Sequence, residues 1–149
     1  MTVTTHSELE TAAVGRSIAA GLSAGTVVLL SGDLGAGKTA FVRGLAEGLG
    51  IDPAEVSSPT FSLIQQYRGG RLPLHHVDLY RLRTVEVDEI GLEELSLEGG
   101  VMAIEWPDRL PRPLGSAVVV YIAHGDGDTR SIVVENLPST PTDSSAPLW

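Results

Sequence analysis

The spacing of apolar and polar residues divides the first third of the chain into helix, strand, glycine-rich loop and helix. Apolar residues recur every fourth position in 7–22, which predicts a helix with one buried face. The run 26–30, TVVLL, is β-branched and aliphatic, as is typical of a strand buried on both faces. A second helical period runs through 41–49 and stops at Gly50. The glycine-rich segment 31–44 begins where the strand ends and contains the start of this helix.

The pattern of apolar and polar residues in the rest of the chain predicts more strands. Four segments are expected to form two antiparallel pairs, 60–67 with 72–80 and 117–123 with 129–135, because each pair is joined by a turn-rich sequence. The acidic segment 84–95 is expected to be helical, and 101–104 to be a further buried strand. Parallel elements around the glycine loop, with hairpins elsewhere, predict an α/β domain with a mixed sheet flanked by helices.

Composition limits the number of domains and the cellular setting. A chain of 149 residues with 42% apolar content suits one domain. We expect this domain to span 1–136, and 137–149 to be a flexible tail, because LPSTPTDSSAPLW is too rich in Pro, Ser and Thr to order itself. The N-terminal residues lack a basic region followed by an apolar core, and no apolar run approaches the roughly 20 residues of a membrane span. A soluble cytoplasmic protein is the expectation.

Charge and cysteine content exclude several kinds of function. There is no cysteine, so disulfides and thiolate metal sites are impossible. Ten basic residues against 19 acidic ones give a net charge of -9, which repels a nucleic-acid backbone. If RNA is involved, another molecule must hold it.

The glycine-rich segment fits the phosphate-binding pattern G-x-x-x-x-G-K-[ST], with Gly32, Gly37, Lys38 and Thr39 at the fixed positions. Its context, after a strand and before a helix, is the one that the pattern requires. Backbone N–H groups would surround the phosphates, Lys38 would reach the β- and γ-phosphates, and the Thr39 hydroxyl would bind Mg²⁺. The nucleotide-contacting residues expected from this loop are Asp33, Leu34, Gly35, Ala36, Gly37, Lys38, Thr39 and Ala40.

Two acidic residues are candidates to help hold the metal ion. Glu105 ends the apolar run 101–105, so we favour it as a direct Mg²⁺ ligand; the alternative is a surface carboxylate at the start of a loop. Asp78 ends a more polar and presumed peripheral strand, and is expected to be an auxiliary carboxylate that positions water or the switch segment. For Asp78 the alternative is a structural cap or an ion-pair partner of Arg81.

The segment 57–61, SSPTF, offers Ser58 and Thr60 as hydroxyls that could sense the γ-phosphate, although it could equally be an ordinary turn. His75 and His76 adjoin on an expected strand and therefore point to opposite faces, which argues against a paired metal site. No N-K-x-D sequence is present to read guanine, so adenine is the favoured base.

Taken together, these motifs resemble the TsaE (YjeE) family of bacterial ATPases, which are needed to make threonylcarbamoyladenosine in tRNA. The matching sequences are GDLGAGKT at 32–39, VRG at 42–44, SPTF at 58–61, HVDLYRL at 76–82 and IEWPDRL at 104–110. They cover roughly residues 7–135 in order. The phosphate loop alone is generic, whereas the other four at these separations are highly specific.

The resemblance implies a P-loop NTPase fold and an ATPase that uses Mg²⁺ and acts with two partner proteins, TsaB and TsaD. It implies that ATP hydrolysis resets the TsaB–TsaD complex between turnovers and that tRNA is met only through that complex. It implies Thr39 and Glu105 as magnesium ligands, Asp78 beside Lys38 and Glu105 as catalytic residues, and 58–60 as a switch. The adenine would lie near residues 8–11.

Two other functions share the phosphate loop. A small metabolite kinase would need a lid with several arginines, and only Arg109, Arg112 and Arg130 follow residue 83. A nucleotide-binding adaptor that hydrolyses nothing would not need Glu105 or Asp78.

Overall fold

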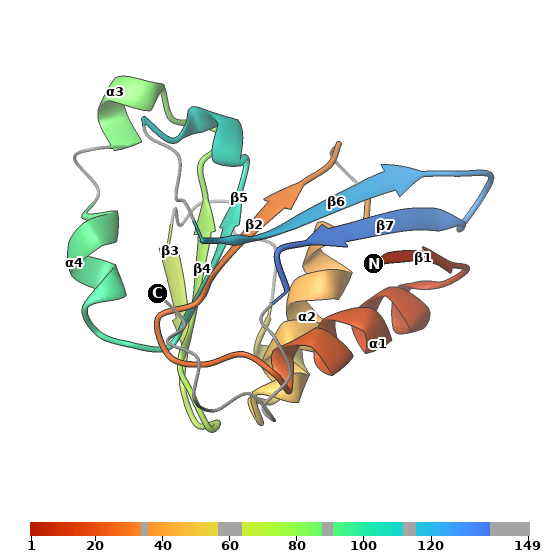
Figure 1. The fold of residues 1–149 in the computed structure, drawn as a ribbon, viewed down its shortest axis with the longest axis horizontal. Coiled ribbons are helices and arrows are strands. Elements are labelled where there is room, and N and C mark those ends of the chain that lie inside the picture. The colour runs from red at the N-terminus through yellow and green to blue at the C-terminus, as the bar shows by residue number, and fades with distance from the viewer. Residues whose placement is uncertain (34–35, 57–63, 88–90, 112–115, 138–149) are drawn as a thin grey trace.

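The computed structural model describes residues 1–33, 36–56, 64–87, 91–111 and 116–137, and within them the chain forms a seven-stranded mixed sheet with helices on both faces (Figure 1). The strands are β1 (Thr2–Thr5), β2 (Val27–Ser31), β3 (Ile64–Tyr67), β4 (Leu74–Asp78), β5 (Val101–Glu105), β6 (Val118–His124) and β7 (Arg130–Glu135). Their order across the sheet is β1-β7-β6-β2-β5-β4-β3. In the described part of the chain no helix is long and apolar enough to cross a membrane.

The centre of the sheet is parallel and its two edges are antiparallel. Strands β6, β2, β5 and β4 run parallel to one another, whereas β3 pairs antiparallel with β4, and β7 with β6. All five residues of β5 are buried, as expected for a central parallel strand. The predicted mixed sheet and both predicted antiparallel pairs are confirmed.

Helices α1 (Glu8–Ala19) and α2 (Lys38–Gly48) lie together on one face of the sheet (Figure 1). Ser7 caps α1 as predicted, since its side chain accepts a hydrogen bond from the backbone N–H of Glu10 at 3.1 Å. The two helices approach so closely that a Cβ added at Gly44 would lie 1.9 Å from the carbonyl oxygen of Ala12. Gly44 therefore allows the backbones of α1 and α2 to touch.

The pattern missed one strand and gave one wrong prediction. The N-terminal strand β1 was not expected, because its sequence TVTT is short and mostly polar; it pairs with β7 at the edge of the sheet. The single helix expected over 84–95 is two short ones, α3 (Thr84–Val87) and α4 (Leu92–Ser96). Gly91 precedes α4 with a φ of 78°, a left-handed conformation that cannot continue a helix. Two single turns of 3₁₀ helix, Pro53–Glu55 and Pro107–Arg109, complete the regular structure of the described residues.

Alternation along the strands gives the sheet two apolar faces. Val28 and Leu30 of β2 belong to the larger core beneath α1 and α2, while Val27 and Leu29 pack against the smaller core beneath α3 and α4. The same period places every second residue of β4 and β5, up to their last residues, on the α2 side. The carboxyl ends of these parallel strands thus lie near the first turn of α2.

Candidate functional site

The glycine-rich loop connects the end of β2 to the start of α2, and Gly32 and Gly37 lie at its two described ends. Gly37 has a φ of 106°, a left-handed conformation that favours glycine. At Gly32 an added Cβ would lie 2.6 Å from the carbonyl oxygen of Ile122 on β6, so only glycine fits there without movement of the backbone. The two fixed glycines of the motif are thus required by the local structure.

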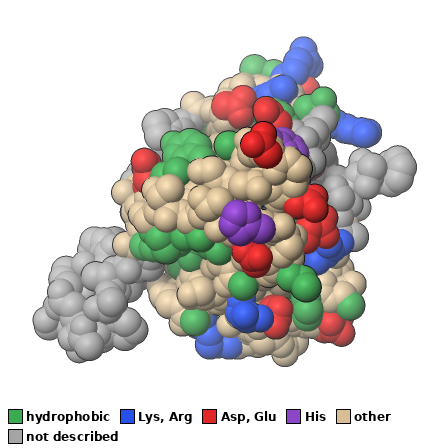
Figure 2. Space-filling model, turned by 90° about the vertical axis from the view of Figure 1, so that its right-hand side faces the viewer, with side chains coloured by type: hydrophobic (Ala, Val, Ile, Leu, Met, Phe, Trp, Pro, Cys, Tyr) green, Lys and Arg blue, Asp and Glu red, His purple; other side chains and the backbone are tan. Residues whose placement is uncertain are grey.

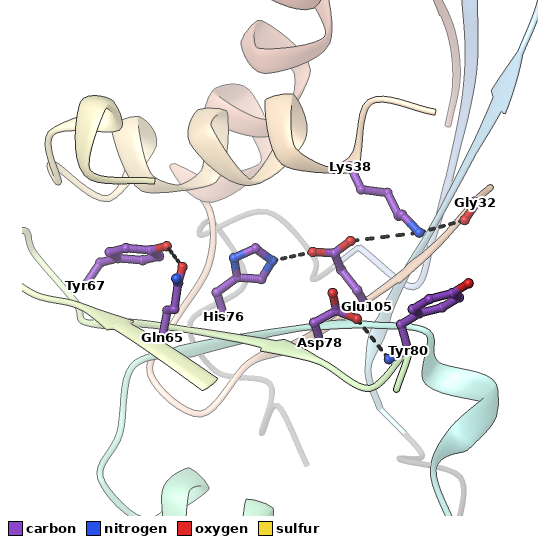
Figure 3. A network of polar contacts seen from close by, with 8 residues as sticks. All are labelled: Gly32, Lys38, Gln65, Tyr67, His76, Asp78, Tyr80 and Glu105. Carbon is purple, nitrogen blue, oxygen red and sulfur yellow. Dashed lines mark hydrogen bonds and ion pairs between the residues drawn. The ribbon is translucent and has the colours of Figure 1, made fainter. Parts of the chain in front are cut away.

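Lys38, the only lysine of the chain, is placed at the centre of the site (Figure 3). Its side chain is 5% exposed, and its Nζ donates a hydrogen bond to the carbonyl oxygen of Gly32 at 2.7 Å. The same Nζ lies 3.9 Å from Oε1 of Glu105 and 4.3 Å from the centre of the Trp106 ring. Burial lowers the pKa of Lys38, and the carboxylates of Glu105 and Asp78 partly offset this effect.

Glu105 and Asp78 are brought side by side by strand register. They are paired residues at the carboxyl ends of the parallel strands β5 and β4. Glu105 is only 5% exposed, so the alternative of a surface carboxylate is wrong. The expectation that β4 is peripheral is also wrong, because β4 lies between β5 and β3 and Leu74–Val77 are buried.

Asp78 has a structural role as well as its place in the site. Its Oδ1 accepts a hydrogen bond from the backbone N–H of Tyr80 at 2.9 Å, as a cap of the following turn would. Within the described residues no ion pair joins it to Arg81, so of the two structural alternatives only the cap is correct. Burial, together with repulsion by Glu105, raises the pKa of Asp78 against the opposing effects of the Tyr80 N–H, His76 and Lys38.

His76 begins the matching sequence HVDLYRL, but its place in the site was not predicted. It is fully buried, and its Nε2 lies 2.5 Å from Oε2 of Glu105. His75 points to the other face, where its Nε2 lies 2.9 Å from the carbonyl oxygen of Gly99, so the predicted separation of the two histidines is confirmed. The signal available in the sequence was the two-residue spacing of His76 and Asp78, which puts both on one face of a strand.

Trp106 covers the site beside Lys38. Its backbone has a φ of 61°, an uncommon conformation for a large residue, and its ring centre lies 4.9 Å from that of Tyr80. These contacts hold the indole against the lysine, where it limits the access of water to Nζ.

A cavity of about 260 Å³ adjoins the loop on the side of α1. Its lining residues come from the start of α1, the start of α2 and the β6–β7 turn: Ser7, Glu8, Thr11, Gly37, Ala40, Asp128 and Arg130. Arg130 also donates from Nε to the carbonyl oxygen of Ala36 at 3.1 Å, which ties the turn to the loop. Asp128 and Arg130 were not predicted, because only the folded chain brings this turn to the loop.

The other predicted residues are placed as follows. Asp33 is exposed, Ala36 and Ala40 are buried, and Thr39 is half-buried in the first turn of α2. Four predicted residues, Leu34, Gly35, Ser58 and Thr60, lie outside the described residues.

The donor set suits Mg²⁺ held together with a nucleotide rather than a metal held by protein alone. Over the described ranges there is no group of three or more His, Cys, Asp or Glu side chains arranged to hold a metal ion. Mg²⁺ in nucleotide sites takes most of its oxygens from phosphates and water, and needs only one or two protein ligands. The hydroxyl of Thr39 and the buried carboxylate of Glu105 fit that requirement.

The loop, the lysine in the first turn of α2 and the parallel strands around them define a P-loop NTPase fold. The family model described as "Threonylcarbamoyl adenosine biosynthesis protein TsaE" matches residues 5–132, and the chain therefore belongs to the TsaE family. The fold is similar to that of YdiB from Bacillus subtilis, whose crystal structure superposes with a TM-score of 0.70 and 35% identity over 89% of this chain and 82% of that one.

Curated relatives carry the same family name. The chain is 49% identical to the tRNA threonylcarbamoyladenosine biosynthesis protein TsaE of Synechocystis sp., over 66% of this chain and 64% of the relative. It is 44% identical to the protein of that name from Nostoc sp., over 82% and 77%. For the Bacillus subtilis protein of that name the identity is 42%, over 83% and 77%. Membership of the family places the chain in the biosynthesis of threonylcarbamoyladenosine in tRNA.

Proposed function

We propose that this protein binds ATP with Mg²⁺ and hydrolyses it in support of threonylcarbamoyladenosine formation in tRNA. The observation that carries the proposal is the position of Lys38, which lies on the first turn of a helix behind a glycine loop, with Glu105 and Asp78 beside it at the ends of two parallel strands. That combination of one cation, two carboxylates and a helix N-terminus is suited to a triphosphate and its metal ion.

The phosphates would be held by the loop and by Lys38. Its ammonium group donates a hydrogen bond to the carbonyl oxygen of Gly32 and lies 3.9 Å from the carboxylate of Glu105. When a nucleotide binds, phosphate oxygens would take the place of these two partners and bring negative charge closer to Nζ. Thr39 and Glu105 would hold Mg²⁺, which neutralises charge on the β- and γ-phosphates. The cavity beside α1 would receive the adenine, because it opens next to Gly37 and includes the expected residues Glu8 and Thr11.

Asp78 is the residue best suited to orient the attacking water. One of its oxygens is fixed by the N–H of Tyr80, and its carboxylate lies next to Glu105 in strand register. Burial and the neighbouring carboxylate raise its pKa, which makes the ionised form a better proton acceptor than an exposed aspartate. Ser58 and Thr60 would complete the site as the segment that senses the γ-phosphate.

We further infer that this protein forms a complex with TsaB and TsaD, and that ATP hydrolysis changes the state of that complex. With a net charge of -9 the chain is poorly suited to hold tRNA itself. On the face that Figure 2 shows, the basic side chains of the described residues form small groups among acidic ones rather than one continuous basic surface. The tRNA would thus be held by the partners, and ATP hydrolysis would reset their complex between turnovers.

Two of the three arginines that follow residue 83 argue against the metabolite kinase, and the third, Arg112, lies outside the described residues. Arg109 donates to the carbonyl oxygen of Leu82 at 2.8 Å, and Arg130 donates to that of Ala36. Both therefore support backbone in this structure, and neither is placed as a lid residue. The activity of the Asp78→Ala variant distinguishes the non-hydrolysing adaptor from the ATPase.

The nucleotide site is tested by titrating Lys38→Ala with ATP and Mg²⁺ in a calorimeter. We expect binding to fall by at least about 100-fold, because the phosphates lose a charge-assisted contact of roughly 3 kcal/mol. Arg16→Ala is a matched control, since it removes a positive charge that is paired with Glu47 on the outer surface of α1. Unchanged affinity in Lys38→Ala would contradict the site.

The role in tRNA modification is tested by reconstitution. TsaB, TsaD, tRNA and the activated threonyl donor are incubated with ATP and either wild-type protein or the Asp78→Ala variant, and modified tRNA is counted per TsaD. We expect several turnovers with wild type and about one with the variant. Equal multiple turnover without this protein would contradict the resetting role, and full turnover with Asp78→Ala would favour the adaptor.

A further inference from the structure

His76 and Glu105 lie in two of the matching sequences, HVDLYRL and IEWPDRL, but the contact between them was not predicted. Both side chains are buried, at 0% and 7% exposure, and Nε2 of His76 lies 2.5 Å from Oε2 of Glu105. An ionised carboxylate can only accept a hydrogen bond, so Nε2 is the nitrogen that carries the proton. Nδ1 of His76 is buried with no hydrogen-bond partner among the described residues, so the ring makes its one polar contact through Nε2.

Strand geometry explains how the imidazole reaches this carboxylate. In the parallel register of β4 and β5, His76 is paired with Ala103, and Glu105 is two residues further along β5. The small side chain of Ala103 leaves the ring room to lean along the sheet toward the carboxylate, as diagonal neighbours do. Figure 3 shows the resulting chain of contacts from His76 through Glu105 to Lys38.

The two oxygens of Glu105 thus have different surroundings. Oε2 is held by His76, whereas Oε1 is turned toward Nζ of Lys38, 3.9 Å away, at the start of α2. A glutamate side chain without such an anchor would sample several rotamers and lose its aim at the loop.

We propose that His76 is a positioning residue, which donates from Nε2 to Oε2 of Glu105 and so directs Oε1 toward the Mg²⁺ that accompanies ATP. The inference rests on the proposed function, because it concerns the same site. Groups that orient metal ligands in this way affect metal affinity by about 10- to 100-fold. His76 would therefore set how much Mg²⁺ the protein needs to bind ATP, without touching the nucleotide.

The test compares two amide substitutions. In His76→Gln the amide nitrogen can take the place of Nε2 and still donate to Glu105. In His76→Asn the amide nitrogen takes the place of Nδ1 and does not reach the Glu105 carboxylate. The Mg²⁺ concentration that gives half-maximal ATP binding is measured by calorimetry, together with ATP affinity in EDTA. We expect His76→Asn to raise the Mg²⁺ requirement about tenfold or more and His76→Gln to change it less than about threefold, with affinity in EDTA within about twofold of wild type.

His75→Asn is the matched control. His75 is equally buried on the same strand, but its Nε2 lies against the carbonyl oxygen of Gly99 on the opposite face. Its substitution should lower stability and leave the Mg²⁺ requirement unchanged.

Each result decides one point. If wild type binds Mg²⁺ and ATP while His76→Asn keeps the wild-type Mg²⁺ requirement, or if Gln and Asn raise it equally, the inference is overturned and the proposed function stands. A wild type that binds no ATP overturns both. If His76→Asn does not fold, nitrogen NMR of wild type decides: addition of Mg²⁺ to the ATP complex should shift the Nε2 resonance of His76 and not that of His75. An unmoved His76 resonance would overturn the inference.

Discussion

Two long helices cover one face of the sheet, and two short ones lie on the other. Helices α1 and α2 have 12 and 11 residues, whereas α3 and α4 have 4 and 5 (Figure 1). The long pair packs backbone against backbone through glycine, while each short helix buries one side chain, Val87 in α3 and Leu95 in α4. Helices this short are not stable alone and depend entirely on such contacts.

The charged side chains of the candidate site face the long helices. Lys38 begins α2, Glu105 and Asp78 end β5 and β4 on the α2 side, and His76 lies two residues before Asp78 on the same face of β4. The candidate site is thus built on the side of the sheet with the larger core, which suits the proposed function because catalytic groups need a support that does not move. Among the described residues the α3–α4 side has fewer buried apolar side chains, so we expect it to open at a lower free energy. Substitutions can measure this difference.

The largest effect is expected from Gly44→Ala. The new Cβ would lie 1.9 Å from the carbonyl oxygen of Ala12, so α1 and α2 would have to separate. We expect a loss of about 3–5 kcal/mol in the free energy of unfolding, even though alanine favours a helix by about 1 kcal/mol over glycine. Urea unfolding measures it. Gly21→Ala is the control, with its nearest atom at 3.8 Å, and a comparable loss there would show that close packing is not the cause.

The two faces are compared directly by removing one leucine from each. Leu45 of α2 is fully buried, and Leu95 of α4 is 9% exposed. We expect Leu45→Ala to cost about 3–4 kcal/mol and Leu95→Ala about 2 kcal/mol, because the thinner layer around α4 can close over the missing atoms. Equal losses in urea unfolding would contradict the proposed difference between the faces.

A smaller effect, of opposite sign, is expected from Asp78→Asn. The pKa of Asp78 is raised in the folded chain, so its stabilising contribution is present below its ordinary pKa and is lost as pH rises through the raised value. Near neutral pH the ionised carboxylate therefore destabilises the fold. We expect Asp78→Asn to raise the melting temperature there by a few degrees and to change it little near pH 3. A variant less stable than wild type at neutral pH would show that the ionised carboxylate of Asp78 does not destabilise the fold.

The smallest effects are expected from surface ion pairs on the two sides. Arg16 pairs with Glu47 at 3.2 Å beside the long helices, and Arg83 pairs with Glu86 at 2.9 Å beside the short ones. Both pairs are exposed, so Arg16→Ala and Arg83→Ala should each leave the melting temperature nearly unchanged. A larger change in either, measured by thermal unfolding, would mean that charge and not packing distinguishes the faces.

The sequence predicted those parts of the molecule that depend on neighbours along the chain. The glycine motif with its flanking strand and helix was enough to place Lys38, and the two-residue period of strands was enough to separate His75 from His76. The interpretation of β4 as peripheral failed because histidines were counted as polar, yet both are buried where a carbonyl oxygen and a carboxylate accept hydrogen bonds from them. Arg130 reaches Ala36 only through folding, so no local pattern could reveal it. The roles of Ser58 and Thr60 stay predictions.

The presence of a single lysine gives the site a chemical handle. Reagents that acylate lysine side chains have one such target in this protein, Lys38, and it is shielded by Trp106 and only 5% exposed. One added acyl mass on a lysine therefore reports the opening of the phosphate loop. The N-terminal amine reacts with the same reagents, so the rate at which that mass appears on the peptide containing Lys38, followed by mass spectrometry after digestion, would time the exposure of the site.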